Sequence, residues 1–343
     1  MLKPLVALKR WSWWNLWLAL AWLPLSAGAA GWTLTEGANP AGPGRRHLVA
    51  REGKPVAALV HGEGQFKPYL HVYGVEGELL TNGGLDKEGK PTGAFPHHRG
   101  IYIGWNQIRS ELGGMDGKGK GFDLWHLNNG GRMEVQKVER LETGVEGVRF
   151  AATVVWRGGK KDASGSDVLL SEVRTFDITQ PGGRTQVNVH FELKAARDLR
   201  LEGDLQHAGV HFRASNEVSQ RAAETAYLWE PPLPGPGGKV SSKDLKWCRL
   251  VFPIGQRWYA ATEINAPTNP VEELSWRDYG RFGFFFKRAL QKDEVLKLDY
   301  RFLIEPAEAP AEKGKLSAAQ AEQARQAAQA DHAAFARGSR LTP

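Results

Sequence analysis

The stretch from His47 to about Glu305 constrains the fold more than any other feature of the sequence. Short runs of alternating or β-branched residues follow one another there, separated by Gly, Pro, Asn or Asp, which is typical of β-strands joined by turns. About fifteen runs can be counted, with almost no helical periodicity between them, so a parallel sheet with long crossover connections is disfavoured. The clearest runs are 46–51, 67–73, 148–157, 168–178, 184–194, 246–254, 257–264, 281–286 and 295–304.

This stretch contains no linker-like segment over about 260 residues, which favours one large sandwich over two small ones. We therefore predict an all-β fold, a large antiparallel β-sandwich, as a single domain over residues 31–310. Two loops rich in Gly and Pro, 113–121 and 231–238, interrupt the pattern and are expected to be exposed.

The composition changes to Ala, Gln and Lys after Pro310. Residues 311–343 are predicted to form a helical tail, with the helix from about Leu316 to Ala336. Ser317 can cap its start and Gly338 its end. Because the apolar residues of this helix are mostly alanines, we expect it to lie on the sandwich surface or to project from it.

The first 30 residues stand apart from the rest. Three cationic residues precede the apolar run Trp11–Leu25, and the small residues 26–30 follow. This pattern predicts a secretory signal peptide over residues 1–30, cleaved after Ala29 or Ala30. A membrane anchor is the alternative, but the run of about 15 residues is shorter than the roughly 20 that span a bilayer. The mature protein is expected in the bacterial periplasm or outside the cell, with no membrane partner.

Charge and cysteine content exclude several classes of function. The formal charge is +7, and loss of the three signal-peptide cations leaves a modest +4, spread among acidic residues. No nucleic-acid partner is therefore expected. Cys248 is the only cysteine, which excludes an internal disulfide and any Cys-x-x-Cys metal or redox motif.

Histidines recur in three short motifs, FPHHRGIYIGW (95–105), DLWH (123–126) and HAGVHFR (207–213). Successive side chains of a strand point to opposite faces. In the third motif, His207, Gly209, His211 and Arg213 are therefore expected on one face, with Ala208, Val210 and Phe212 on the other.

The first motif begins with Pro96, which favours a turn. That turn is expected to present His97, His98 and Arg99 at the mouth of a sheet. A single histidine often caps a strand or bonds a backbone carbonyl. The repeated grouping of His and Arg beside aromatic residues instead predicts a shared functional pocket, because buried polar groups must be paired.

The segment SEVRTF (171–176) places Glu172 and Arg174 on one face of a strand. One interpretation is an ordinary ion pair of little energetic value. The functional interpretation makes Glu172 an acid or base, while Arg174 sets its protonation state or binds a substrate oxygen.

Aromatic residues near these groups suggest a sugar ligand. Gly209 would open a shallow groove between His207 and His211, and tryptophan rings can stack on the C–H faces of a sugar. The alternative for each tryptophan is core packing, and Trp125, beside His126, is the best candidate for a sugar contact.

A metal site is an alternative use of the histidines. In an extended strand His207 and His211 lie roughly 13 Å apart, whereas each zinc ligand lies about 2 Å from its ion. Both could ligate one metal only with a bulge at Gly209, together with His97, His98 or His126. We predict no cofactor, and keep a divalent metal as the alternative.

The ordered segments KPYLHVYGVEGELLTNGG, FPHHRGIYIGW, LWH, SEVRTFD, HAGVHFR and NPxxxxSWRDYG (269–280) resemble the bacterial PmoA-like family of uncharacterised exported proteins. The resemblance covers about residues 55–305. It implies a β-sandwich similar to the galactose mutarotase superfamily, whose members bind or process carbohydrates. The family label refers to a methane monooxygenase subunit with several membrane spans, an activity that this sequence excludes. The resemblance implies a histidine acid, His211 or His207, and a carboxylate base, Glu172.

Together these features predict an exported carbohydrate-active enzyme of the mutarotase, epimerase or lyase type, with His211, Glu172 and His207 as catalytic residues. The expected substrate-binding residues are His97, His98, Arg99, Trp125, His126, Arg174, Arg213, Trp276 and Arg277. Two other functions stay open, a non-catalytic glycan-binding module and a His-ligated, metal-dependent hydrolase or lyase.

Overall fold

The computed structural model describes residues 31–116, 121–126, 130–233 and 239–338. The predicted signal peptide lies outside these residues, as do parts of the two loops rich in Gly and Pro. Within them, the alternation of the sequence becomes an alternation of burial. In β8 (Gly147–Arg157) every second side chain is buried, as expected for a strand with one face on a core.

A nine-stranded sheet forms one layer. Its central strands β5 and β12 pair from Ala208 opposite Trp105 to Phe212 opposite Ile101. In spatial order its strands are β1 (Trp32–Ala38), β2 (Arg45–Arg51), β3 (Lys54–His61), β4 (Tyr69–Val72), β5 (Ile101–Trp105), β12 (Ala208–Arg213), β18 (Arg281–Phe285), β17 (Glu273–Arg277) and β14 (Lys239–Ser241).

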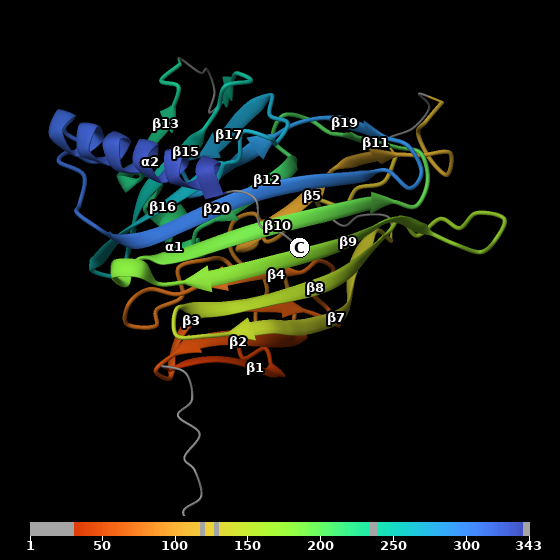
Figure 1. Cartoon of the computed structure of the whole chain (residues 1–343), viewed down its shortest axis with the longest axis horizontal. Coiled ribbons are helices and arrows are strands. Elements are labelled where there is room, and N and C mark those ends of the chain that lie inside the picture. The colour runs from red at the N-terminus through yellow and green to blue at the C-terminus, as the bar shows by residue number, and fades with distance from the viewer. Residues whose placement is uncertain (1–30, 117–120, 127–129, 234–238, 339–343) are drawn as a thin grey trace, which may run out of the picture.

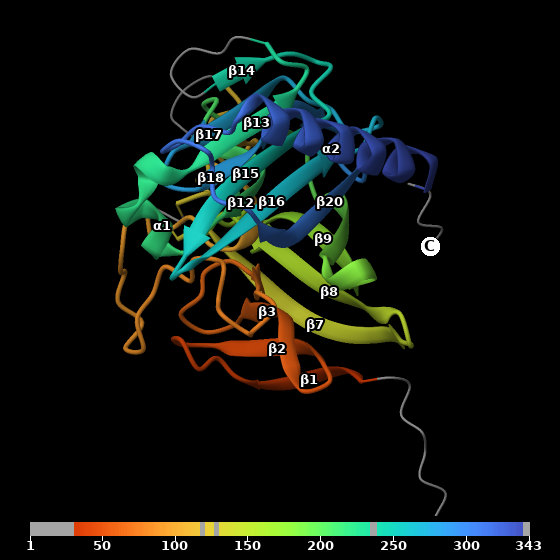
Figure 2. The ribbon, with the colours of Figure 1, turned by 90° about the vertical axis from the view of Figure 1, so that its left-hand side faces the viewer.

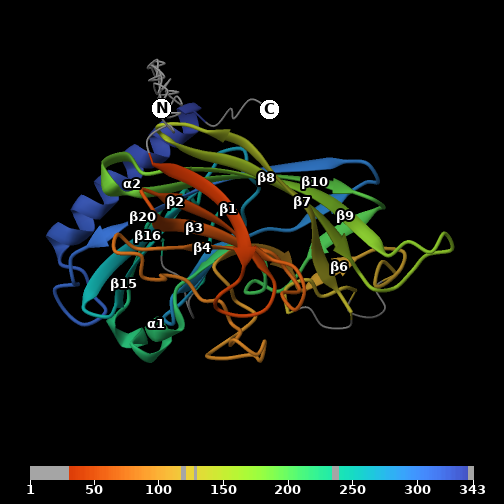
Figure 3. The same cartoon turned by 90° about the horizontal axis from the view of Figure 1, so that it is seen from below.

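An eight-stranded sheet forms the second layer and lies in front of the central strands of the nine-stranded sheet in Figure 1, while Figure 3 shows the two layers from below. Its strands in order are β13 (Ala226–Glu230), β15 (Trp247–Ile254), β16 (Arg257–Asn265), β20 (Val295–Ala307), β10 (Thr185–Ala195), β9 (Val168–Thr179), β8 and β7 (Arg132–Thr143). A third sheet consists of β19 (Arg288–Leu290), β11 (Leu199–Glu202) and β6 (Gln107–Arg109).

The described strands pair antiparallel throughout the three sheets. One hydrophobic core fills the space between the two large layers. Ile103 and Phe212 enter it from the nine-stranded sheet, and Phe150 and Phe302 from the eight-stranded sheet. The predicted all-β antiparallel sandwich is therefore confirmed.

The helices lie outside this core. A short helix, α1 (Asn216–Gln220), follows β12, and η1 (Pro181–Gly183) and η2 (Ala222–Glu224) are single 3₁₀ turns. The long helix α2 (Ala318–Gly338) crosses the outer side of the eight-stranded sheet near β16 and β20 (Figures 1 and 2). As predicted, Ser317 caps it, because the Ser317 hydroxyl accepts the Gln320 backbone N–H at 3.1 Å.

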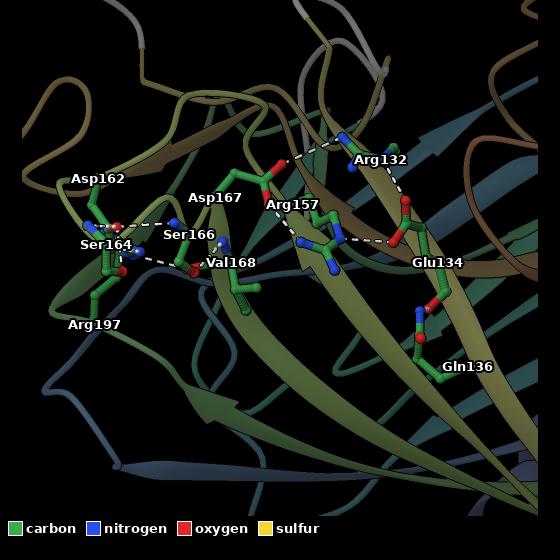
Figure 4. Close-up of polar contacts among 10 residues, drawn as sticks. All are labelled: Arg132, Glu134, Gln136, Arg157, Asp162, Ser164, Ser166, Asp167, Val168 and Arg197. Carbon is green, nitrogen blue, oxygen red and sulfur yellow. Dashed lines mark hydrogen bonds and ion pairs between the residues drawn. The ribbon is translucent and has the colours of Figure 1, made fainter.

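Charged side chains tie together one end of β7, β8 and the start of β9 (Figure 4). Arg157 of β8 donates to Glu134 of β7 at 2.7 Å and to Asp167, just before β9, at 2.6 Å. Arg132 contacts the other oxygen of Asp167 at 3.4 Å. One guanidinium thus links three consecutive segments of the eight-stranded sheet.

Candidate functional site

Four histidines meet on the outer face of the nine-stranded sheet, and we call them the histidine cluster: His97, His98, His126 and His207. The ring of His126 lies between those of His97 and His207, with centroid distances of 4.5 and 4.8 Å. His97 and His98 are 4.2 Å apart. Three chain segments supply the cluster, namely the loop before β5, the segment 121–126 and the turn before β12.

Two members of the cluster are held by carboxylates. His126 Nδ1 lies 2.9 Å from Asp123 Oδ2, and His207 Nδ1 lies 2.8 Å from each carboxylate oxygen of Asp204. Both side chains are 27% exposed. A carboxylate on Nδ1 fixes the ring orientation and leaves Nε2 available to a ligand. The cluster therefore contains two adjacent Asp–His pairs with accessible rings.

The other two histidines are held in the neutral form. Trp125 Nε1 donates to His98 Nε2 at 3.1 Å, which leaves the ring proton of His98 on Nδ1, an atom without a partner among the described residues. Burial and the charge of Lys67 lower the pKa of His97 to about 3. Its buried Nε2 also has no partner among the described residues. These two nitrogens offer unused hydrogen-bonding capacity.

Two aromatic rings border the cluster. Tyr279, from the turn between β17 and β18, lies almost parallel to His98, with an interplanar angle of 9°. Phe95 stacks on Tyr279 with centroids 4.5 Å apart, and 46% of Phe95 is exposed. An exposed phenylalanine beside partly exposed imidazoles is a suitable surface for stacking a ring-shaped ligand.

A buried layer supports the cluster from below. Lys67 donates to the Trp125 carbonyl oxygen at 2.6 Å, and its ammonium lies 4.5 Å from the centroid of the Tyr102 ring. Trp125 in turn packs edge-on against His211, with centroids 4.8 Å apart. Trp125 is fully buried, so it supports His98 and cannot stack on a sugar as predicted.

Two glycines allow this layer to form. A Cβ on Gly104 would lie 2.6 Å from the Leu124 carbonyl oxygen, so the missing side chain lets residues 122–126 cross the sheet closely. Gly209 has φ +92°, and a Cβ there would lie 1.9 Å from the Phe284 carbonyl oxygen. The β12–β5 register runs through Gly209 without a shift. Gly209 thus serves close strand packing and forms no bulge.

His211 lies on the predicted face, opposite Val210 and Phe212, but it is fully buried. Its Nε2 lies 2.9 Å from the Ala208 carbonyl oxygen, and its Nδ1 lies 3.1 Å from Arg281. Both ring nitrogens are engaged, so a ligand has no atom of His211 to reach. The geometry opposes the predicted catalytic role and makes His211 part of the supporting layer.

Glu172 lies in the core, on the other side of the nine-stranded sheet. It is 1% exposed, accepts from Trp156 Nε1 at 2.6 Å and is held by Arg174 at 2.5 Å. The same face of β9 carries the core residue Phe176. Glu172 and Arg174 thus form a buried ion pair and cannot join the histidine cluster as base and substrate ligand.

The predicted arginines Arg99 and Arg213 bond mainly backbone oxygens. Arg99 donates to Pro96 O at 3.0 Å and to Gln65 O at 2.8 Å. Arg213 donates to the carbonyl oxygens of Ala214 and Tyr279. Both are buried, so they shape the loops of the cluster and do not contact a ligand directly.

Trp276 and Arg277 point to opposite faces of β17. Trp276 stacks on Trp229 with centroids 5.8 Å apart and packs against the core, away from the cluster. Arg277 shares the outer face with Arg281, its register partner. It is half-buried near the cluster, where burial and the charge of Arg281 lower its pKa, opposed in part by Tyr279 and acidic neighbours that include Asp204.

The metal-dependent interpretation gains no support from the described residues. Among them, no group of three or more His, Cys, Asp or Glu side chains is arranged to hold a metal ion.

Among the described residues, neither helix has the length and apolar character needed to cross a bilayer.

Several residues of the site were missed by the sequence prediction, although signals for them exist. The Asp–His pairs share one motif, because Asp123-Leu-Trp-His126 and Asp204-Leu-Gln-His207 both have the form D-L-x-H, which occurs only twice in the sequence. Phe95 and Tyr279 lie within quoted motifs. Lys67 and Tyr102 also lie within quoted motifs, and Arg281 begins the strand run 281–286. No feature of these segments distinguished the three as site residues.

Solved structures with some likeness to the chain include three with low TM-scores. An α-galactosidase of family GH36, AgaB from Geobacillus stearothermophilus, gives a TM-score of 0.37 at 12% identity, over 80% of this chain and 41% of that chain. A galactose mutarotase related enzyme from Lactobacillus acidophilus gives a TM-score of 0.35 at 9% identity, over 75% of this chain and 97% of that chain. A galactose mutarotase-like protein from Clostridium acetobutylicum gives a TM-score of 0.38 at 8% identity, over 81% of this chain and 99% of that chain.

No curated protein matches the sequence. Residues 46–319 match a family described as "Family of unknown function (DUF6807)", a description without the PmoA-like name that the motifs suggested. The matched region includes the strands that carry the cluster, the core pair Glu172–Arg174 and the first residues of α2. Because this match covers most of the chain, the protein belongs to the DUF6807 family of unknown function.

Proposed function

We propose that this protein is an exported carbohydrate-active enzyme in which the histidine cluster transfers protons to and from a sugar. The observation that carries the proposal is the contact between two Asp–His pairs. His126 and His207 come from distant segments, each has its own carboxylate, and their rings lie 4.8 Å apart. Two partly exposed imidazoles side by side can serve one substrate as acid and base.

The chemistry follows from the orientation of each pair. With Nδ1 held by a carboxylate, the Nε2 atom of each ring faces a ligand, and the carboxylate stabilises the imidazolium when the ring takes up a proton. In a mutarotation, one ring removes the proton of the anomeric hydroxyl while the other protonates the ring oxygen, and the C1–O5 bond opens. Reversal of these transfers closes the ring in either configuration. Epimerisation or elimination next to a carbonyl needs the same pair.

The surroundings of the two pairs favour a sugar over an unspecified polar ligand. Phe95 is 46% exposed beside the cluster, and the partly exposed rings of His126 and His207 supply hydrogen-bonding groups next to it. Aromatic stacking on C–H faces combined with several hydrogen-bonding groups is the usual way in which proteins bind sugars.

The test is a screen of the purified protein against monosaccharides, oligosaccharides and their keto derivatives, with product detection. On the substrate found, His126→Gln and His207→Gln should each lower kcat by about 10²–10⁴-fold. His190→Gln is the matched control, because His190 on β10 is also paired with a carboxylate, Asp299 at 2.8 Å, but lies in the other sheet. It should keep full activity.

Full activity in both cluster variants would contradict the proposal. A sugar that binds at the cluster with no product under any condition would replace the enzyme with a glycan-binding module. Circular dichroism and thermal unfolding of each variant separate a loss of chemistry from a loss of fold.

A further inference from the structure

The charges around the histidine cluster are unbalanced. Six Lys or Arg side chains are buried among the described residues: Lys67, Arg99, Arg174, Arg197, Arg213 and Arg281. Two of them have carboxylate partners, Arg174 with Glu172 and Arg197 with Glu111. Both of these lie away from the cluster. The remaining four form no ion pair with a carboxylate among the described residues.

These four cations all lie beside or beneath the cluster. Lys67 bonds the carbonyl of Trp125, which precedes His126. Arg281 bonds the carbonyl of Gln206, which precedes His207, at 2.9 Å.

The other two cations border the same site. Arg99 follows His98 in the chain, and the Arg213 guanidinium lies 4.9 Å from the centroid of the Tyr279 ring. Carbonyl oxygens accept hydrogen bonds from Arg99 and from the terminal nitrogens of Arg213 but do not neutralise their charge, and the buried Nε of Arg213 has no partner among the described residues.

Burial and the neighbouring cations lower the pKa values of His98 and Lys67. The pKa of His98 is well below its ordinary value because of burial, and then because of Arg281, His97 and Lys67. Burial, and then Arg99, likewise lower the pKa of Lys67, against the effect of Asp123. Burying a cation without a counter-ion is strongly unfavourable. Arg174 and Arg197 each contact a carboxylate directly, whereas none of the four cations at the cluster does so among the described residues.

We propose that the ligand of the histidine cluster is an anion, namely a sugar that bears a carboxylate, sulfate or phosphate group. The sugar part rests on the proposed function, whereas the charge rests on the unbalanced cations alone. Asp123 and Asp204 are already engaged by His126 and His207, so the negative charge that the site lacks comes from the ligand. Arg277, half-buried on the same face as Arg281, is the cation most accessible to it.

Isothermal titration calorimetry at low ionic strength tests this without relying on turnover. The probes are neutral and charged pairs, glucose with glucuronate and glucose 6-phosphate, galactose with galacturonate, and also inorganic sulfate and phosphate. The charged member of at least one pair should bind about tenfold tighter than its neutral partner, and added salt should weaken it. Histidine ¹⁵N chemical shifts should move at the cluster when the anion binds.

Arg277→Gln should lower the affinity for the charged sugar far more than that for its neutral partner, and so remove most of the preference for the charged sugar. Arg149→Gln is the control, because Arg149 on β8 is also half-buried but lies in the other sheet. Equal affinity for charged and neutral sugars would overturn the inference. So would an unchanged preference in Arg277→Gln, or binding of no probe at all.

The two proposals can fail separately. Binding of sulfate or phosphate at the cluster, with no sugar bound, would support the anion site and contradict the carbohydrate function. Turnover of a neutral sugar that binds more tightly than its charged partner would support the carbohydrate function and contradict the anion site.

Discussion

Gly104 shows how a single missing side chain shapes the site. It lies on β5 beside Tyr102, on the outer face, where residues 122–126 cross the sheet. A Cβ at this position would lie 2.6 Å from the Leu124 carbonyl oxygen and 3.5 Å from the Trp125 Cα. Because the first contact is with backbone, the neighbour cannot simply rotate away. The whole segment that carries Trp125 and His126 depends on this absence.

We predict that Gly104→Ala displaces this segment. Overpacking of this kind costs about 1–3 kcal/mol of unfolding free energy, and it should separate His126 from His207. Urea denaturation measures the first effect, and ligand binding or turnover the second. Gly37→Ala is the control, because a Cβ on Gly37 in β1 meets nothing within 4 Å. Equal stability and activity of the two variants would show that the segment tolerates the extra methyl group.

At the scale of elements, the ion pairs at the ends of β7, β8 and β9 fix how these strands meet. The Asp167 side chain is 7% exposed and shares its oxygens between Arg157 and Arg132. Its strong partner is Arg157, at 2.6 Å. Hydrogen bonds to charged groups with little exposure are stronger than surface pairs.

Arg157→Met should therefore lower the free energy of unfolding by about 1.5–3 kcal/mol, because it removes the main donor of Asp167 and leaves Glu134 with Arg132 as its other donor. Lys137→Met is the matched control on β7. Its ion pair with Glu139 has side chains 62% and 54% exposed, and such pairs contribute only about 0–1 kcal/mol. Chemical denaturation of both variants measures the two changes in the free energy of unfolding. A loss in Lys137→Met as large as that in Arg157→Met would refute the assigned role.

The helix α2 packs on the outer side of the eight-stranded sheet through two buried side chains. Its side chains Ala328 and Phe335 are buried against Trp247 and Leu303 of the eight-stranded sheet. Arg184, between β9 and β10, bonds Asp331 with both terminal nitrogens, at 2.7 and 2.9 Å. Of the two predicted positions, surface packing is the one observed. The helix covers the sheet that does not carry the histidine cluster.

At the scale of the whole molecule, buried neutral histidines make the fold sensitive to acid. Burial lowers the pKa of His71 to about 3 and that of His61, aided by His47, to about 4. Burial also holds the pKa values of His98 and His211 well below 6.5. In the unfolded chain these rings take up protons below about pH 6.5. Acid therefore favours the unfolded state over the window between the two pKa values.

We predict that the free energy of unfolding falls between pH 6.5 and pH 5 by about 1.4 kcal/mol per pH unit for each fully buried histidine. Urea denaturation at several pH values measures this slope. In His71→Gln the slope should be smaller by about 1.4 kcal/mol per pH unit, which corresponds to one proton. His71 is 2% exposed, and its Nδ1 lies 2.8 Å from the uncharged Thr81 hydroxyl. Constant stability across this window would contradict the prediction.

The sequence by itself determined the fold class, the approximate boundaries of the nine clearest strands and the capped C-terminal helix, because a period of two, turn residues and caps are local properties. The alternation of 207–213 also placed His211 and Val210 on opposite faces correctly. Which polar residues meet was decided only by the tertiary structure. Strand order sets β5 beside β12 and places the sheet between Glu172 and His211. The three histidine motifs were expected to share a pocket, but pairing between segments far apart in the chain leaves no local pattern that could name His126 and His207 as the pair in contact.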